Sequence, residues 1–272
     1  MCKHKYGKYD FYKLIEPKSI DELFTLLMNE NDSAIFRGQS DASWGFETSL
    51  ERTINRTGAS DVDMFQYVSN QFITNNTFNK QMHLFSNEAK EYTDYWDRLA
   101  YMQHYGFPTP LLDFSRSPFI ALYFSLDVNG NAKNNKSALF VVEIKAIHHL
   151  SIESIKLDYK KEMGIEADIS IDLIDYAREQ GKPYLFSKNP TKANSRILNQ
   201  QGCFILSTAH LPNMVDSFNI YGNTLVKKYE FPSDWRFDIH HKLEKMNITG
   251  SVLFPSTKGV VEGLKRDFLL RK

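Results

Sequence analysis

The chain has 272 residues, of which 42% are apolar and 24% charged, with 33 basic residues against 33 acidic ones. This composition excludes a disordered or collagen-like protein and supplies enough apolar side chains for a large core without metal or disulfide support. The formal net charge of zero also excludes a global positive field that would hold the protein on nucleic acid or membrane without specificity.

The remaining composition points to a reducing compartment. Two cysteines, Cys2 and Cys203, are too few for a disulfide framework or a four-thiolate zinc site. No window approaches the length of a membrane span, and no signal peptide follows the basic first residues, so we expect a cytoplasmic protein with no membrane contact. The adjacent histidine pairs 148–149 and 240–241 lack zincin spacing, and we expect no metal.

Three segments in the first third of the chain carry clear patterns. A helix of about ten residues is predicted after Ser19, which is a good capping residue. Residues 34–38 form a short apolar run that contains Arg37 near its end, which predicts a buried strand opening into a loop. Helical spacing over residues 60–105, with an Asn-rich break near 74–80, predicts two or three helices.

The segment 101–126 combines the most informative features. Gly and Pro residues end the preceding helix, and residues 111–114 are typical of a short strand. Ser117 and Pro118 then suit the cap and the first position of an apolar helix.

The second half of the chain alternates between strand-like and helix-like patterns without a βαβ rhythm. No G-x-G-x-x-G turn is present, so an α+β fold is favoured over a doubly wound nucleotide fold. Aromatic residues are spread evenly and no linker is visible, which predicts a single domain over residues 1–272. The expected strands are 137–145, 202–208 and 251–255, and the expected helices are 165–179 and 234–246.

Two further features allow a structural and a functional interpretation. Cys203 suits the core of a strand, and a role as nucleophile is the alternative. The stretch 182–196 interleaves aromatic residues with Lys182, Lys188, Lys192 and Arg196, so it is either a solvated loop or a surface that touches a nucleic acid strand.

A set of motifs in fixed order resembles the FRG domain family, which is named for its Phe-Arg-Gly motif. The resemblance extends from residue 35 to 255, leaving 1–34 as a helical lead-in and 256–272 as a C-terminal tail. The family usually has Arg where Pro110 stands and often Trp where Phe114 stands, so one cation of its site is missing here. The matching runs are 35–41 with Trp44, 103–106, 108–109, 111–114, 117–118, 121–124, 196–197, 200–202 with Phe204, and 253–255.

The order of these motifs also resembles the ADP-ribosyltransferase fold, which implies a split, mostly antiparallel sheet surrounded by helices. Such enzymes carry an Arg or His on the first strand, a polar strand–helix unit in the middle and a Glu before a late strand. Arg37, Asp113 and Gln201 stand at these positions and are the catalytic residues that the resemblance implies.

The resemblance further implies NAD as cofactor. Arg37 would hold the phosphates, Asp113 with Ser115 and Tyr123 would form the central wall, and Gln201 would face the ribose. Because Gln201 is neutral where a carboxylate is expected, catalysis would come from Asp113 or Glu143, or be absent. The full set of expected NAD-binding residues is Arg37, Gly38, Gln39, His104, Tyr105, Thr109, Ser115 and Tyr123.

Several of these residues also have purely structural interpretations. Arg37 would then belong to an ion pair that holds the first strand, and Gln201 would be a buried amide bonded to backbone. His104 and Tyr105 would close the end of a helix, whereas the functional alternative has Tyr105 or Tyr123 stacking on nicotinamide or adenine.

The expected function is NAD-dependent ADP-ribosyl transfer, a glycosyltransferase-class reaction, to a macromolecule. Nucleic acid, RNA or DNA, is the preferred acceptor and protein the alternative, and the resemblance implies a toxin or phage-defence effector with a possible antitoxin partner. A different class is also open: a non-catalytic sensor or adaptor that binds a nucleotide or a protein in the same cleft.

Overall fold

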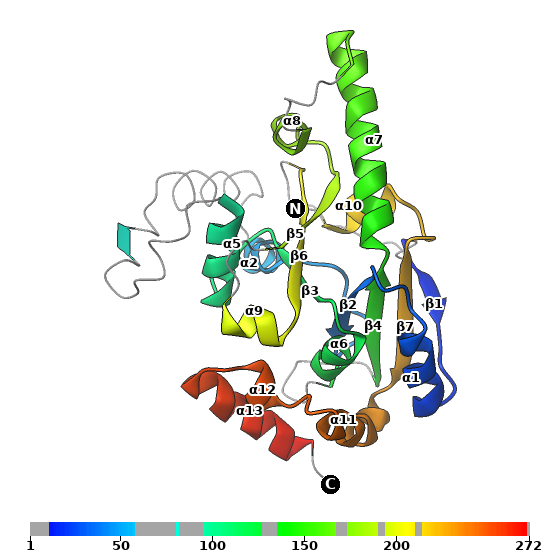
Figure 1. Cartoon of the computed structure of the whole chain (residues 1–272), viewed down its shortest axis with the longest axis vertical. Helices are drawn as coiled ribbons and strands as arrows, with labels where there is room; N and C mark the ends of the chain where they lie inside the picture. The colour runs from blue at the N-terminus through cyan, green and yellow to red at the C-terminus, as the bar shows by residue number, and fades with distance from the viewer. Residues whose placement is uncertain are drawn as a thin grey trace.

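The computed structural model describes residues 11–57, 80–81, 95–126, 135–166, 173–189, 194–209 and 214–270. In these ranges the chain forms one sheet with helices on both faces (Figure 1). Apart from residues 80–81, the helices expected between residues 58 and 94 lie outside the described residues. The strands are β1 (Lys13–Ile15), β2 (Ile35–Gln39), β3 (Leu112–Ser115), β4 (Lys136–Val142), β5 (Leu185–Lys188), β6 (Gly202–Ser207) and β7 (Val226–Pro232).

The helices vary from single turns to a long rod, α7, that projects from one end of the molecule (Figure 1). A 3₁₀ turn (Ser233–Trp235) leads into α11. The helices are α1 (Ile20–Met28), α2 (Ser49–Thr57), α5 (Tyr95–His104), α6 (Pro118–Phe124), α7 (Ile144–Met163), α8 (Leu173–Glu179), α9 (Ser195–Asn199), α10 (Met214–Asn219), α11 (Arg236–Lys245), α12 (Gly250–Leu253) and α13 (Thr257–Leu269).

The seven strands lie in the order β1-β7-β4-β2-β3-β6-β5. The β1–β7 pair is parallel and all other neighbours are antiparallel, so the α+β, mostly antiparallel class is confirmed. The sheet is continuous, but its central seam is weak: β2 pairs with β4 over five positions, whereas its register with β3 consists of Phe36 opposite Ser115.

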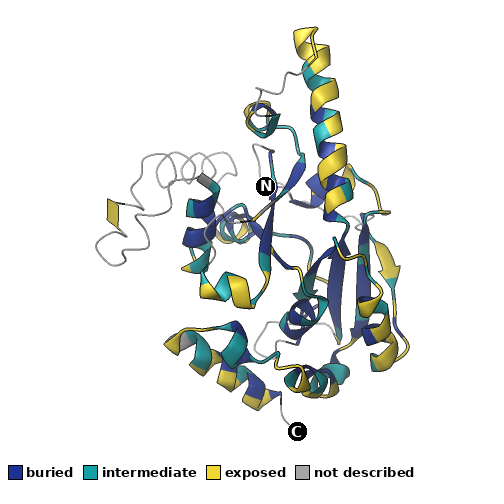
Figure 2. Cartoon of the chain, viewed as in Figure 1, coloured by how far each residue is buried: buried dark blue, intermediate teal, exposed yellow. Residues whose placement is uncertain are grey.

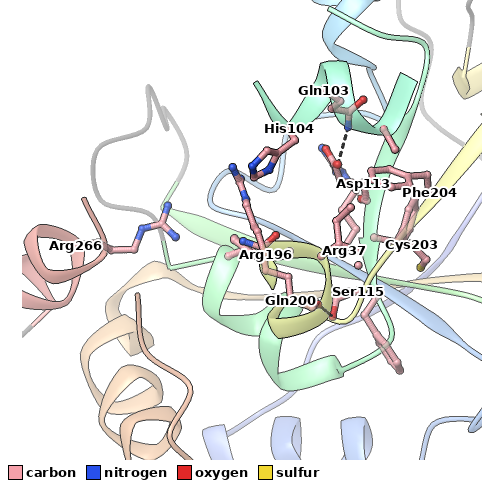
Figure 3. Close-up of a pocket in the computed structure, with 18 residues that line it drawn as sticks. Arg37, Gln103, His104, Asp113, Ser115, Arg196, Gln200, Cys203, Phe204 and Arg266 are labelled. Carbon is pink, nitrogen blue, oxygen red and sulfur yellow. Dashed lines mark hydrogen bonds between the residues drawn. The ribbon is translucent and has the colours of Figure 1, made fainter. Parts of the chain in front are cut away.

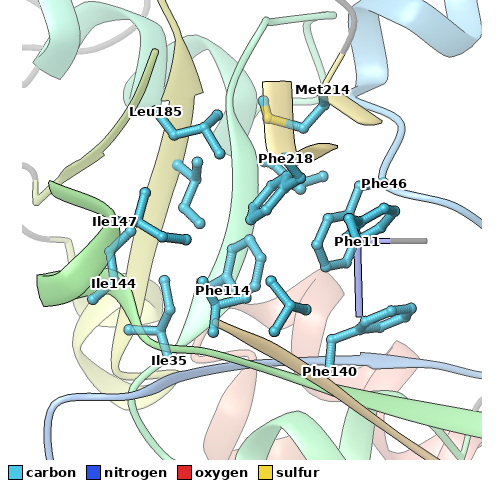
Figure 4. Packing of buried hydrophobic residues seen from close by; sticks show 14 of the residues in the cluster. Phe11, Ile35, Phe46, Phe114, Phe140, Ile144, Ile147, Leu185, Met214 and Phe218 are labelled. Carbon is cyan, nitrogen blue, oxygen red and sulfur yellow. The ribbon is translucent and has the colours of Figure 1, made fainter. Parts of the chain in front are cut away.

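One face of the sheet is covered by a cluster rich in phenylalanine, which we call the aromatic cluster (Figure 4). The ring of Phe46 lies at its centre, 4.5 Å from Phe140, 4.8 Å from Phe218 and 5.2 Å from Phe11 between centroids. Such large rings bury much apolar area at low cost in side-chain entropy, which accounts for the high aromatic content of the chain.

The opposite face carries two separate clusters instead of one. The first packs α1, α6 and α11 on β2, β4 and β7, and the second packs α2, α5 and α8 on β5 and β6. Between them lies β3, whose Leu112 and Phe114 belong to the aromatic cluster on the other side. Because strand side chains alternate, Asp113 and Ser115 are the β3 residues that face this gap.

Burial follows this arrangement, with the sheet enclosed and the outer part of α7 exposed (Figure 2). The predicted cap of α6 is confirmed: Ser117 accepts a hydrogen bond from the amide of Ile120 at 3.3 Å, and Pro118 is the first helical residue. In the described part of the chain, none of the helices combines the length and the apolar character that crossing a membrane requires.

One prediction about the C-terminal region was wrong. Residues 251–255 were expected to form a strand, but 250–253 form the short helix α12. The C-terminal tail that follows contains the helix α13. Gly250 and Gly263 bring these helices into contact, since a Cβ on Gly250 would lie 2.3 Å from the Cα of Gly263. A four-residue apolar run does not distinguish strand from helix, and here tertiary packing decided.

The other elements match the predictions more closely. Strands β2, β3 and β6 and helices α1 and α11 are confirmed within a residue or two at their ends. The strand expected at 137–145 ends at Val142, and the helix α7 begins at Ile144. Of the helix expected at 165–179, α8 forms the described final part.

Candidate functional site

A cavity of about 360 Å³ opens where β2 and β3 part, and we call it the seam cavity (Figure 3). Beyond the pair Phe36–Ser115 the two strands diverge, and β6, α5, α6, α9 and α13 complete the walls. This volume falls within the range of small-molecule sites. The charged and imidazole side chains in its lining are Arg37, His104, Asp113, Arg196 and Arg266.

Arg37 lies in the middle of β2 and reaches across the open seam to β3. Its Nη1 donates to the main-chain oxygen of Asp113 at 2.7 Å, and its Nε is buried with no hydrogen-bond partner among the described residues. Burial lowers the pKa of Arg37 to about 10, although the Asp113 carboxylate opposes this shift. The partner of Arg37 is therefore a carbonyl oxygen, not the carboxylate of the structural ion pair that the sequence left open.

The carboxylate of Asp113 is held by a short relay of polar side chains. Gln103 on α5 donates from Nε2 to Oδ1 of Asp113 at 2.6 Å. The hydroxyl of Thr109 donates in turn to Oε1 of Gln103, which fixes the orientation of the amide. Thr109 is fully buried and lies outside the lining of the seam cavity, where it positions Gln103.

Gly38 and Gln39 follow Arg37 on β2 and serve packing. A Cβ on Gly38 would lie 1.8 Å from the carbonyl oxygen of Ala121, so α6 approaches β2 only because residue 38 is glycine. Gly38 nevertheless lines the cavity with its backbone. Gln39 is buried outside the lining and donates to the carbonyl of Gly45 at 3.0 Å, so it holds the following loop instead of a ligand.

His104 and Tyr105 end α5 at the rim of the site. His104 lines the seam cavity, whereas Tyr105 is 55% exposed and lies outside the lining. The two rings meet edge to face at 4.9 Å, and Tyr105 also packs against Tyr101. The structural interpretation thus describes Tyr105, whereas His104 forms part of the cavity wall.

Ser115 and Tyr123 occupy different surroundings from those expected. Ser115 lines the cavity, but its hydroxyl donates to the carbonyl of Gln200 at 2.8 Å and ties β3 to the turn before β6. Tyr123 is fully buried and donates to Asp267 at 2.8 Å, and burial raises its pKa. The ring of Tyr123 packs in the core beneath the sheet-facing side of α6, and the structure therefore places Tyr123 outside the lining of the seam cavity.

Gln201 does not line the seam cavity, but its neighbour Gln200 does. Gln201 adopts a positive φ of 47° in the turn after α9, and this turn carries its side chain to the exposed surface. Gln200 donates from Nε2 to the carbonyl of Leu253 at 3.0 Å. Glu143, the other candidate base, stands between β4 and α7 outside the lining.

Four polar lining residues were not among the expected catalytic or NAD-binding residues, although Arg196 was named in the stretch left open as a nucleic acid surface: Gln103, Arg196, Gln200 and Arg266. Gln103, Arg196 and Gln200 all stand inside the motifs quoted for the family resemblance, so that resemblance carried a usable signal. Arg266 lies beyond the last motif, and only the packing of α13 brings it to the wall.

Two further sequence candidates have surroundings that fit a structural role. Cys203 lines the seam cavity but is buried, and burial raises the pKa of its thiol to about 12, which argues against a nucleophile. Lys182 forms ion pairs with Asp158 and Glu162, in the stretch that was left open as a nucleic acid surface, while Lys192 lies outside the described residues. No group of metal-ligating side chains occurs in the described ranges.

Comparison with known proteins bears on one of the two resemblances. Residues 32–135 match the model of the FRG domain. This match supports the FRG family over a shorter range than the expected 35–255. Neither the curated proteins nor the solved structures gave a match, so the resemblance to ADP-ribosyltransferases stays a prediction.

The FRG segment, residues 32–135, supplies β2, α5, β3 and α6 and with them Arg37, Gln103 and Asp113. The opposite wall comes from later in the chain, through α9, β6 and α13. The seam cavity is thus assembled from the FRG segment and from residues that follow it.

Proposed function

We propose that the chain binds NAD in the seam cavity and transfers its ADP-ribose to a macromolecule, with nucleic acid preferred over protein. The observation that carries this proposal is the contact between Arg37 and Asp113 at the open seam. It places a cation with unused N–H donors and a held carboxylate side by side in one cavity.

The lining fits the chemical parts of a dinucleotide. The guanidinium groups of Arg37, Arg196 and Arg266 suit a diphosphate, for which arginine offers a planar, bidentate donor set. Phe36, Phe124 and Phe204 offer apolar surface for rings, and His104 adds a polar edge. Asp113, with one oxygen bonded to Gln103, has acceptor capacity left for ribose hydroxyls.

The reaction requires stabilisation of positive charge. Cleavage of the bond between nicotinamide and ribose develops an oxocarbenium-like ribose, which a fixed carboxylate stabilises. Asp113 is the carboxylate in the described lining, and the amide of Gln103 holds it in one orientation before a ligand arrives. Catalysis is therefore assigned to Asp113, with Arg37 holding the phosphates, and no longer to Gln201.

The second candidate is a sensor or adaptor that binds a nucleotide or a protein without turnover. The position before the late strand β6, where ADP-ribosyltransferases carry a Glu, favours the sensor or adaptor. Here Gln200 lines the wall, and its amide is already bonded to the carbonyl of Leu253. Neither Gln200 nor Gln201 can act as a base toward an acceptor. In either case, a toxin or phage-defence role with an antitoxin partner rests on the family resemblance alone.

Incubation of the protein with NAD labelled in its ADP-ribose part and with cell extract distinguishes the two functions. An enzyme transfers label to material that nuclease or protease digestion identifies, and Arg37→Ala and Asp113→Asn lose the transfer. Arg178→Gln on α8, outside the cavity lining, is the matched control and keeps it. Binding of NAD without transfer would establish the sensor, and equal labelling by Asp113→Asn would contradict the assigned mechanism.

A further inference from the structure

Arg196 is a second cation in the seam cavity, and it forms no ion pair within the part of the chain that the structure describes. It stands on α9, and its recorded contact is with the ring of Phe254, at 5.2 Å from the guanidinium carbon. Among the described residues its guanidinium shows no hydrogen bond and no ion pair. Burial lowers the pKa of Arg196, and the field of Asp113 opposes the shift.

Arg37 and Arg196 share the cavity with the carboxylate of Asp113, which also accepts a hydrogen bond from Gln103. Among the described residues, neither guanidinium forms an ion pair with that carboxylate. Taking a guanidinium out of water costs free energy that a nearby anion or hydrogen bonds must return. Arg37 donates one such bond, to a carbonyl oxygen, and the contact of Arg196 with the described residues is with the ring face of Phe254. An anionic ligand would supply the missing partner for both.

We propose that Arg196 is a specificity-determining residue that, together with Arg37, selects a ligand with two linked phosphates, as in a nucleoside diphosphate. The two side chains enter from different elements, β2 and α9, and both line the same space (Figure 3). Two separate guanidinium groups, each able to form paired hydrogen bonds, match a ligand with two phosphates better than a ligand with a single phosphate. This inference rests on the proposed function only for the identity of the natural ligand.

The position of the two groups favours a small ligand over a nucleic acid backbone. Nε of Arg37 is buried, and Arg196 is largely withdrawn from solvent beside Phe254. A polymer backbone would contact side chains at an exposed rim, whereas a diphosphate of a small nucleotide can enter the cavity. Arg266 differs, because its guanidinium already lies over the ring of Tyr123 at 5.3 Å, so it is not required for the selection.

Isothermal titration of the full chain with ADP, AMP and adenosine tests the inference. Wild type is expected to bind ADP about tenfold or more tightly than AMP, since each charged hydrogen-bonding group contributes about that factor. Arg196→Gln is expected to lose about tenfold or more of the ADP affinity and most of the preference over AMP. Arg178→Gln, the control, keeps both values.

Arg196→Lys serves as a second variant, to be read if Arg196→Gln fails to fold by circular dichroism. Lysine keeps the positive charge but lacks the planar, bidentate guanidinium, so an intermediate loss of ADP affinity is expected. ADP binding that is absent in wild type, no tighter than AMP, or unchanged in both Arg196 variants would overturn the inference. The labelled-NAD experiment is a separate test. A preference for ADP over AMP without transfer of label would refute the enzymatic function but not the role of Arg196. Transfer of label by a protein whose ADP affinity does not depend on Arg196 would refute the role of Arg196 but not the enzymatic function.

Discussion

Gly38 is the residue whose replacement the structure constrains most sharply. Gly38→Ala is expected to destabilise the protein by about 3 kcal/mol or more, because the new Cβ would meet the backbone of α6, which cannot rotate away. Urea denaturation measures the change. Gly202→Ala is the control, since its Cβ would lie 3.5 Å from Ile197, an ordinary contact, and we expect a change within about 1 kcal/mol. Equal stabilities for both variants would contradict the close approach.

Thr109 provides a second test at this scale. Thr109→Val removes the hydroxyl that orients Gln103 and accepts from the amide of Leu111, so we expect a loss of about 1–3 kcal/mol and weaker label transfer. Thr109→Ser keeps the hydroxyl and loses one methyl group, which costs about 1 kcal/mol, and should retain transfer. If serine and valine behaved alike, the relay to Asp113 would be refuted.

The sequence identified the residues of the site better than their contacts. Arg37 and Asp113, 76 positions apart and both among the expected site residues, are in contact. Tyr123 and Gln201 lie outside the seam cavity for local reasons: the helical phase of α6 turns Tyr123 into the core, and a positive φ turns Gln201 outward. Neither the phase of a seven-residue helix against its sheet nor the conformation of one turn residue follows from residue types alone.

At the scale of elements, local signals predicted some elements and failed for others. The Ser117–Pro118 start of α6 carries its own capping chemistry, so it was predicted correctly. Strand β7 was missed because it contains charged residues, including a Lys228 that is buried and donates to the carbonyl of Ala42 at 2.6 Å. A buried lysine with such a partner becomes intelligible only once the neighbouring loop is placed.

Helix α13 is anchored by a buried carboxylate, which makes its docking dependent on pH. Asp267 accepts hydrogen bonds from Tyr123, His240 and the amide of Gly250. Burial alone would raise the pKa of Asp267, but these bonds outweigh it and hold the pKa below its ordinary value. The stabilisation is therefore complete above the unfolded pKa near about 4 and is lost as the pH falls through the lower folded value.

Asp267→Asn tests this dependence. The difference in unfolding free energy between wild type and Asp267→Asn, measured by urea denaturation, is expected to be largest at pH 7 and to shrink toward pH 3. Asp175→Asn, an exposed partner of Arg178 on α8, is the control and should show a small difference at both pH values. A difference for Asp267→Asn that does not change with pH would contradict the anchoring.

At the scale of the whole molecule, the strands β2 and β3 of the FRG segment pair with strands that lie outside the segment. Each backbone partner of β2 in β4 lies in Lys136–Val142, and β3 pairs with β6 in Gly202–Ser207. Of the strand pairs between described residues, a fragment of residues 32–135 would keep Phe36–Ser115 and lose those with β4 and β6. We expect it to show no cooperative unfolding and poor dispersion of amide signals in NMR spectra, unlike the full chain. A well-dispersed, cooperatively unfolding fragment would contradict this.

The sheet order itself could not be read from the sequence, for the same reason. Neighbouring strands such as β1 and β7 are more than two hundred residues apart, and their pairing is set by the shape of the finished core. The two hydrophobic clusters on the face opposite the aromatic cluster leave β3 between them, and the seam cavity forms there. This arrangement is likewise a property of the assembled sheet. The sequence predicted the fold class, and assembly determines where the cavity forms.

A crystal structure of the protein with ADP-ribose tests the central claim most directly, because it locates the ligand relative to both wall arginines. The expected result is density in the seam cavity, with the diphosphate between the guanidinium groups of Arg37 and Arg196 and a ribose hydroxyl on the carboxylate of Asp113. Density for ADP-ribose at another place, or a seam cavity that stays empty at saturating ligand, would contradict the claim.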